Sequence, residues 1–370
     1  MYVTHPRPCR ALRAASQAGF SLVELMIAVT LGLLVLTSLA AAFFSSSRTR
    51  AEVERASQQI ENGRYAVQVL SEDFRLAGYW AQFSVGNAGL PAPGSMPDPC
   101  VLTPIGLSNA IPVHIQGYDN PSAATIAALT CPISDWKPGT DVVVVRRVST
   151  CTRGATDCAT VLNAPYFQAS LCNNTSELGS ATPTDQFRLD TNTASPPLDR
   201  HKKDCTTVQA DIRQVITRIY FIANNDAPGD GIPTLKRAEL VGTTASPTGF
   251  SIASIASGIE NLQLEYGIDT NNDSIPDAMN ADPTSYNACA GPAAACSVTN
   301  WMNVMAVKIN LLARNTLPAS GYTDGKTYTL GTMADGITAN TYTPTGSALA
   351  YKRHIYQAEV RLSNAAARRE

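Results

Sequence analysis

Glu24 is the residue whose chemistry is hardest to reconcile with its surroundings, because it is an acidic side chain inside an apolar segment. No other charge lies between Leu22 and Phe44. At a helical rise of 1.5 Å per residue this segment is roughly 34 Å long, enough to cross the hydrocarbon layer of a membrane. An unpaired carboxylate there costs on the order of 2–3 kcal/mol, so Glu24 needs a positive partner. The nearest one would be an α-amino group, created if the chain were cut just before Phe20.

A second cluster of oxygen-bearing side chains lies in the segment 269–277. Its members are Asp269, Asn271, Asp273 and Asp277. They occupy positions 1, 3, 5 and 9 of a loop similar to an EF-hand loop, and oxygen ligands at alternate positions suit Ca²⁺. The match is incomplete, because Ser274 replaces the glycine of position 6 and Asn280 replaces the bidentate glutamate of position 12. The sequence therefore leaves two interpretations, a calcium-binding loop or an Asx-rich turn that closes a β-hairpin.

The nine cysteines indicate an oxidising compartment. Removal of residues 1–19 would take away Cys9 and leave eight, an even number suited to four disulfides. Connectivity cannot be deduced from the sequence, so pairing of nearest neighbours serves only as a working hypothesis. It predicts the bonds Cys100–Cys131, Cys151–Cys158, Cys172–Cys205 and Cys289–Cys296. A zinc site is not indicated, because there is no C-x-x-C pair and the histidines are isolated from the cysteines.

Motifs for catalysis or nucleotide binding are absent from the sequence. There is no G-x-S-x-G nucleophile motif. The segment 321–327 resembles a phosphate-binding loop, but three residues separate its glycines where four are required, and a β-like stretch follows. The net charge of −2 and the sparse aromatic residues argue against a nucleic-acid surface. We therefore expect neither enzymatic activity nor a nucleic-acid partner, and no cofactor other than Ca²⁺.

Composition and charge distribution predict the location of the chain. Only 16% of its 370 residues are charged, and turn-forming residues are frequent, which is typical of an extracytoplasmic protein. The first 19 residues contain Arg7, Arg10 and Arg13 but no acid. By the positive-inside rule this leader stays in the cytoplasm, and the rest of the chain crosses the inner membrane once and extends into the periplasm.

Beyond the apolar segment, the helix is expected to continue to residue 77. Small and apolar residues recur in alternating steps of three and four, at Val53, Ala56, Ile60, Gly63, Val67, Leu70, Phe74 and Ala77. Gly78 is a natural residue to end the helix. The pattern predicts a helix over 20–78 whose membrane-spanning part is 22–44. The rest of the helix is expected to pack its stripe on a globular domain.

The remainder of the chain, 79–370, has the pattern of a β-rich globular domain. Strands are predicted at 113–118, 141–148, 214–223, 235–241, 262–268, 305–311 and 353–362. In 262–268, apolar and polar residues alternate, which predicts a half-buried strand. A cysteine-rich insertion covers about 84–210. The predicted fold class is α+β, a long N-terminal helix followed by a mainly antiparallel β domain.

The segment Gly19-Phe20-Ser21-Leu22-Val23-Glu24 resembles the prepilin-type signal of type IV pilins and type II secretion pseudopilins. The resemblance implies that a prepilin peptidase cuts after Gly19 and methylates Phe20, and that Glu24 is the assembly residue. Two other interpretations exist. One is a plain membrane anchor, and the other is a secretory signal cut after the small residues 40–42. Sequencing the mature N-terminus would separate them.

Segments of the C-terminal half add a second resemblance, to the PilW family of large minor pilins. They are residues 219–223, 258–270, 301–314 and 351–356. The insertion at 84–210 is not covered by it. The resemblance implies a pilin-like fold related to the pseudopilin GspJ.

Together the two resemblances imply a minor pilin that primes or caps a type IV pilus at its tip. Its partners would be the major pilin and other minor pilins, through the N-terminal helix, and a tip-associated adhesin. Twitching motility and adhesion are the expected processes. Two alternatives remain: a minor pseudopilin of a type II secretion system, and a membrane-anchored surface protein that binds its target with calcium.

Overall fold

The computed structural model describes residues 19–156, 158, 160–161, 163–191, 198–242, 249–286 and 292–366. The chain forms two compact units, of which one ends at Glu54 and the other runs from Arg55 to Glu370. Helix α1 (Leu22–Leu76) contributes to both units. The domain boundary predicted between residues 78 and 79 stays a prediction. The C-terminal part of α1 is buried in the globular unit.

That part of α1 buries one stripe, formed by Gln59, Gly63, Ala66, Leu70, Asp73 and Phe74. The predicted stripe was too long at its N-terminal end, because Val53 is 64% exposed and Ile60 is 42% exposed. At Gly63 the packing is closest, since a Cβ atom there would lie 2.2 Å from the Tyr356 ring. Gly78 has a φ of +72°, so it ends the helix in the left-handed conformation that glycine favours, as predicted.

The first β-sheet is antiparallel and centres on β5 (Ile212–Ala223). Its strand order is β1 (Ile115–Tyr118), β2 (Val142–Val148), β5, β3 (Pro165–Ala169) and β4 (Phe187–Thr191). Strand β6 (Thr234–Leu240) also pairs with β5, and β7 (Phe250–Ser257) pairs with β6. Strand β2 is buried along its whole length, which comprises four consecutive valines followed by Arg146, Arg147 and Val148.

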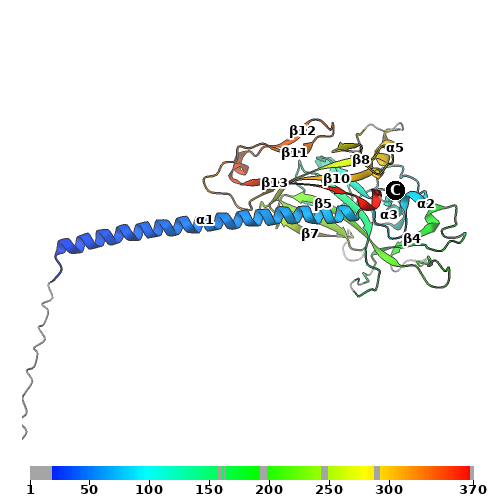
Figure 1. Ribbon diagram of the computed structural model, residues 1–370, viewed down its shortest axis with the longest axis horizontal. Coiled ribbons are helices and arrows are strands. Elements are labelled where there is room, and N and C mark those ends of the chain that lie inside the picture. The colour runs from blue at the N-terminus through cyan, green and yellow to red at the C-terminus, as the bar shows by residue number, and fades with distance from the viewer. Residues whose placement is uncertain are drawn as a thin grey trace, which may run out of the picture. The chain divides into compact units, whose positions relative to one another are not determined.

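The second sheet has the order β13 (Arg353–Arg361), β10 (Val304–Arg314), β8 (Ile259–Ile268) and β9 (Ala278–Asn280). A separate hairpin joins β11 (Tyr328–Thr332) and β12 (Ala339–Tyr342), which lie beside this sheet in Figure 1. The short helices are α2 (Val85–Ala88), α3 (Pro104–Ala110), α4 (Ala123–Ala128), α5 (Ala293–Met302) and α6 (Ser363–Ala366). Two 3₁₀ turns, η1 (Pro183–Gln186) and η2 (Gly346–Ala350), complete the structure. The α+β prediction is confirmed.

The main core lies where α1 and the two sheets meet. Leu70 and Phe74 of α1 pack in one cluster with Val143 of the first sheet and with Leu264 and Val307 of the second. All five side chains are at most 1% exposed. Burial of this apolar surface is the main force that holds the helix on the sheets.

Strand β8 corrects the prediction of a half-buried strand, because both of its faces are buried. Its polar residues are covered by other elements. Glu265 forms an ion pair with Lys308 at 2.8 Å and accepts a hydrogen bond of 2.6 Å from the Thr332 hydroxyl of β11. The alternating polar residues of β8 thus lie on a face that is buried and hydrogen-bonded. Alternation of polar and apolar residues in the sequence does not distinguish such a face from one exposed to water.

A buried acid of α1, Asp73, joins the helix to the first sheet. It is 3% exposed. Its carboxylate pairs with the Arg147 guanidinium at 3.2 Å and with that of Arg218 at 2.8 Å, and it accepts a 2.6 Å hydrogen bond from the Tyr220 hydroxyl. Burial and the adjacent Asp73 charge raise the pKa of Tyr220, while burial lowers the pKa of Arg147. We call these four residues the Asp73 network.

Asp73→Asn is expected to destabilise the globular unit by about 3–5 kcal/mol, because it leaves the buried Arg147 guanidinium without its counter-charge and Arg218 with Glu239 alone. Urea unfolding followed by tryptophan fluorescence measures this. The control is Glu72→Gln on the same helix, whose carboxylate accepts an exposed hydrogen bond from Gln68. Its effect should stay within about 0.5 kcal/mol. Equal effects for the two variants would contradict the role given to the Asp73 network.

Three disulfides lie in the segment that precedes β5. Cys100 pairs with Cys131, Cys151 with Cys158 and Cys172 with Cys205. These are three of the four bonds given by nearest-neighbour pairing. Cys296 is also disulfide-bonded. The fourth predicted bond involves Cys289, which lies outside the described residues. The bonds cross-link a region whose helices and strands are short and whose hydrophobic clusters are smaller than the main core.

Beside the Cys172–Cys205 bond lies a buried carboxylate, Glu177. Its oxygens accept hydrogen bonds from the Ser170 hydroxyl at 2.5 Å, from the His201 ring at 2.7 Å and from the His201 backbone at 3.0 Å. The Asn174 amide donates a fourth bond. Burial raises the pKa of Glu177, but these hydrogen bonds outweigh burial and lower it from 4.5 to about 2.

Because this pKa is lower in the folded state than in the unfolded chain, Glu177 stabilises the fold above pH 4.5. The contribution, up to roughly 3 kcal/mol, should be lost as the pH falls from about 4.5 to about 2. Urea midpoints measured across this range should fall steeply for the unmodified protein and less steeply for Glu177→Gln. Glu61→Gln, at an exposed position on α1, is the matched control. Identical slopes for all three proteins would contradict this role of Glu177.

Candidate functional site

The residues of the predicted cleavage site, Gly19 and Phe20, lie just before α1 and outside any regular element. Phe20 is 89% exposed. No atom lies within 4 Å of the position that a Cβ on Gly19 would occupy, and its φ is not in the left-handed region. The fold of this chain therefore does not require glycine at position 19. An exposed glycine that the fold does not require is consistent with recognition of this position by another protein.

Glu24 lies in the first turn of α1 and closes a capping box with Ser21. The Ser21 carbonyl accepts the first helical hydrogen bond, from Leu25. The Ser21 hydroxyl accepts a bond of 3.3 Å from the backbone of Val23, and the Glu24 carboxylate accepts one of 3.1 Å from the backbone N–H of Ser21. The carboxylate thus turns back toward the peptide bonds that precede the helix.

The sequence interpretation missed this cap, although its signature was legible. Ser21 and Glu24 have the S-x-x-E spacing of a capping box, directly before an apolar run. The sequence alone marks Glu24 as a charge that needs a counter-charge and, by resemblance, as the assembly residue. In the structure it is also a hydrogen-bond acceptor at the positive end of the helix dipole.

The helix that follows is apolar and exposed over its N-terminal half. Among the described residues, α1 is the one helix long and apolar enough to cross a membrane, and none of its most apolar window is buried. Exposed large side chains in this half include Leu25, Ile27, Leu33 and Phe43. An exposed apolar surface of this kind needs lipid or other apolar helices around it.

Comparison with known families identifies both ends of the chain. The family model "Type IV Pilus-assembly protein W" (PilW) matches residues 219–364, and the model of the prokaryotic N-terminal methylation motif matches residues 14–40. The chain contains a PilW domain and a prepilin-type methylation motif. Both resemblances stated from the sequence are thereby confirmed.

A type IV-like pilin from Thermus thermophilus has 12% sequence identity, and the match covers 61% of this chain and 78% of that one. The TM-score of this match is 0.24. No curated protein matches the chain.

The matched families have a general character. Pilin and PilW families are structural rather than catalytic, and pilins interact with other pilins and with the prepilin peptidase. The prepilin signal and the apolar helix indicate membrane anchoring and association with pili. The disulfides Cys100–Cys131, Cys151–Cys158 and Cys172–Cys205 all precede the matched PilW range.

Within the PilW domain, the segment 269–277 closes the hairpin of β8 and β9, because Ile268 pairs with Ala278. Its side-chain oxygens accept hydrogen bonds from groups of the same loop. The Asp269 carboxylate accepts hydrogen bonds from the backbone N–H groups of Asn271, Asn272 and Ser274 at 3.2, 2.6 and 3.0 Å. This geometry is the Asx-rich turn that the sequence left open beside calcium.

The other predicted ligands take part in the same turn. Asn271 accepts a bond from the Asp273 backbone, Asp273 accepts one from Ile275, and Asp277 accepts one from Thr270 at 2.7 Å. The described residues contain no group of three or more His, Cys, Asp or Glu side chains that could hold a metal ion. Calcium binding by Asp269, Asn271, Asp273 and Asp277 stays a prediction.

Asp269→Ala is expected to lower the free energy of unfolding by roughly 2–4 kcal/mol, because three backbone N–H groups lose their acceptor and that of Ser274 is buried. Chemical denaturation measures the change. Asp273→Ala, at the exposed tip of the same turn, should cost less than about 1 kcal/mol. If the two substitutions have the same effect, the turn does not depend on Asp269.

Proposed function

We propose that this PilW protein is a minor pilin that primes or caps a type IV pilus at its tip, after cleavage behind Gly19 and methylation of Phe20. The observation that carries the proposal is the Glu24 carboxylate, whose Oε2 atom lies 3.1 Å from the backbone nitrogen of Ser21. Phe20, the residue before Ser21, would carry the new α-amino group after cleavage.

Cleavage would change the electrostatics at this end of the helix. In the precursor, the nitrogen of Phe20 belongs to a neutral amide bond, whereas in the mature chain it is a cation. Glu24, the single acid of the apolar segment, already faces this end. Two opposite charges in a medium of low polarity attract strongly. Glu24 would neutralise the amine of its own subunit or of a neighbouring one, and so favour docking in a bundle of pilin helices over staying in lipid.

The rest of the chain fits a subunit at the end of a filament. The leader would remain in the cytoplasm and the globular unit would extend into the periplasm, where disulfides form. Its size, residues 55–370, suits a terminal position better than repeated packing along a shaft. The partners would be the major pilin, other minor pilins and a tip-associated adhesin, with roles in twitching motility and adhesion.

A minor pseudopilin of a type II secretion system is the alternative, because the N-terminal motif would serve both assemblies. The PilW match over residues 219–364 favours the pilus. Deletion of the gene discriminates between them. Loss of twitching supports the pilus, whereas loss of secretion with intact twitching supports the pseudopilin.

Glu24→Gln is expected to be cut and methylated normally but to enter filaments at least about tenfold less often, because it keeps the capping acceptor and loses the charge. Mass spectrometry of the purified protein reports the cut and the methyl group. Immunogold labelling of sheared filaments reports incorporation and whether the label lies at one end.

Two further variants separate the charge of Glu24 from its capping role. Ser21→Ala removes the reciprocal cap and keeps the charge, so incorporation should remain within a few fold of normal. Glu54→Gln, an exposed acid later in the same helix, should have no effect. Normal incorporation of Glu24→Gln, or a mature chain that does not begin at Phe20, would overturn the mechanism.

A further inference from the structure

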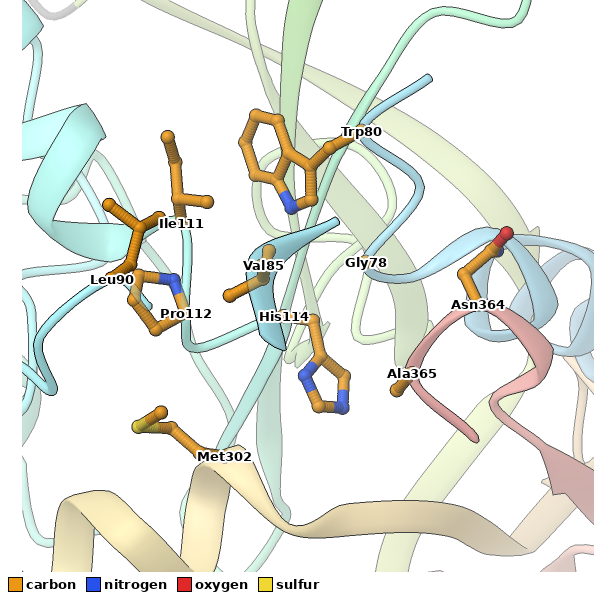
Figure 2. A pocket seen from close by; sticks show the side chains of 10 residues that line it. All are labelled: Gly78, Trp80, Val85, Leu90, Ile111, Pro112, His114, Met302, Asn364 and Ala365. Carbon is orange, nitrogen blue, oxygen red and sulfur yellow. The ribbon is translucent and has the colours of Figure 1, made fainter. Parts of the chain in front are cut away.

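A cavity of about 250 Å³ lies at the C-terminal end of α1, within the globular unit. Its walls come from five separate parts of the chain: the end of α1, the α2 region, the segment before β1, the end of α5, and α6 (Figure 2). No charged Asp, Glu, Lys or Arg side chain lines it, and most of its lining is apolar, including Val85, Leu90, Ile111 and Met302. It therefore favours an uncharged ligand with an apolar body.

One polar group in this cavity has no partner. Trp80 is 1% exposed, and its indole Nε1 forms no hydrogen bond with any described residue. Figure 2 shows this nitrogen on the edge of the ring that faces the other lining residues. An N–H buried without an acceptor is unfavourable, and native proteins seldom leave one so.

The Trp80 ring cannot easily turn away to find another acceptor. It packs against the Phe167 ring at a centroid distance of 5.2 Å, within a cluster that also contains Phe83 and Phe187. The ring is thus held with its donor edge toward the cavity. An acceptor must come from a molecule that enters the cavity.

The other two polar side chains in the wall already make hydrogen bonds. The His114 Nε2 atom lies 2.8 Å from the Val304 carbonyl oxygen and donates to it. The Asn364 amide donates to the Arg75 carbonyl at 3.0 Å. These bonds join the walls to each other. Trp80 is the donor that the structure directs at the cavity.

We propose that this cavity binds an uncharged small molecule with one ring and a short substituent that carries a carbonyl or ether oxygen, which accepts a hydrogen bond from Trp80. The volume fits, since an engineered apolar cavity of roughly 150 Å³ binds benzene. The inference does not rest on the proposed function.

The test compares two molecules of similar shape, acetophenone and ethylbenzene, which differ in the carbonyl oxygen. The full chain in lipid nanodiscs is labelled with 5-fluorotryptophan, and its three tryptophans give three ¹⁹F signals. Trp80→Phe assigns the signal of Trp80. Acetophenone should shift this signal saturably and leave those of Trp136 and Trp301 in place.

Calorimetry against empty nanodiscs then gives the affinities. Acetophenone should bind at least about tenfold more tightly than ethylbenzene, since it supplies the missing acceptor. Trp80→Phe keeps an aromatic ring at this position and removes the N–H donor, so it should bind the two molecules equally. Unchanged Trp136 and Trp301 signals would show that this variant is folded. Ala365→Leu, which fills the cavity and keeps Trp80, should bind neither.

Three results would overturn the proposal. They are a Trp80 signal that does not move, equal affinities for acetophenone and ethylbenzene, and a Trp80→Phe variant that retains the preference. Equal affinities would mean that water serves the indole N–H. Binding that persists in Ala365→Leu would place the ligand elsewhere on the protein or in the lipid.

Discussion

The buried carboxylate of Asp73 is the constraint on which the position of α1 depends. An acid at 3% exposure on a helix is tolerated only when opposite charges and donors meet it, and Arg147, Arg218 and Tyr220 do so from two neighbouring strands. Apolar contacts are non-directional, so a stripe of Leu70 and Phe74 alone allows the helix to rotate or slide. The hydrogen bonds of Asp73 are directional. They fix which turn of α1 faces β2 and β5.

Helix α1 therefore satisfies two different environments along one continuous run of backbone hydrogen bonds. Its N-terminal half exposes large apolar side chains on every face, and Glu24 of the capping pair is the single charge between Leu22 and Phe44. Its C-terminal half is polar outside one buried stripe that ends at Gly78. The first half is suited to an apolar surrounding and the second to a protein core. The same element can thus contribute to assembly and to folding without a change of secondary structure.

The features that could be predicted from the sequence are those set by local patterns. The valines of β2, the glycine that ends α1 and the stripe around Leu70 each depend on neighbours within a few residues. Nearest-neighbour pairing of cysteines also gave three described bonds, because each closes a local segment. In the candidate site, the spacing of Gly19, Phe20 and Glu24 identified the motif.

What could not be predicted depends on partners far away in the chain. Glu265 is buried because Lys308 and Thr332 meet it, and nothing near residue 265 indicates this. Strand β7, with its small residues in Phe250–Ser257, lacks a strong strand pattern and forms through pairing with β6. The absence of a described hydrogen-bond partner for the Trp80 Nε1 atom is also a tertiary property, since it depends on which segments enclose the cavity.

A second buried network of charged residues consists of long-range contacts within the C-terminal part of the chain. Arg353 of β13 is fully buried and pairs with Glu260 of β8 at 2.5 Å and with Asp324 at 2.9 Å. Hydrogen bonds from Tyr328 and Tyr342 to these acids attach the β11–β12 hairpin. All of these residues lie within the matched PilW range of 219–364.

The Asp73 network is distributed differently. Asp73, Arg147 and Arg218 precede residue 219, and only Tyr220 lies inside the PilW range. Removing one partner of a buried ion pair costs stability, although the intact pair adds little net stability. Each network therefore mainly disfavours arrangements in which its partners are not correctly packed. The Arg353 network has this effect within the PilW domain. The Asp73 network has it between that domain, the preceding strand β2 and α1, and so couples the fold of the PilW domain to the helix that carries Glu24.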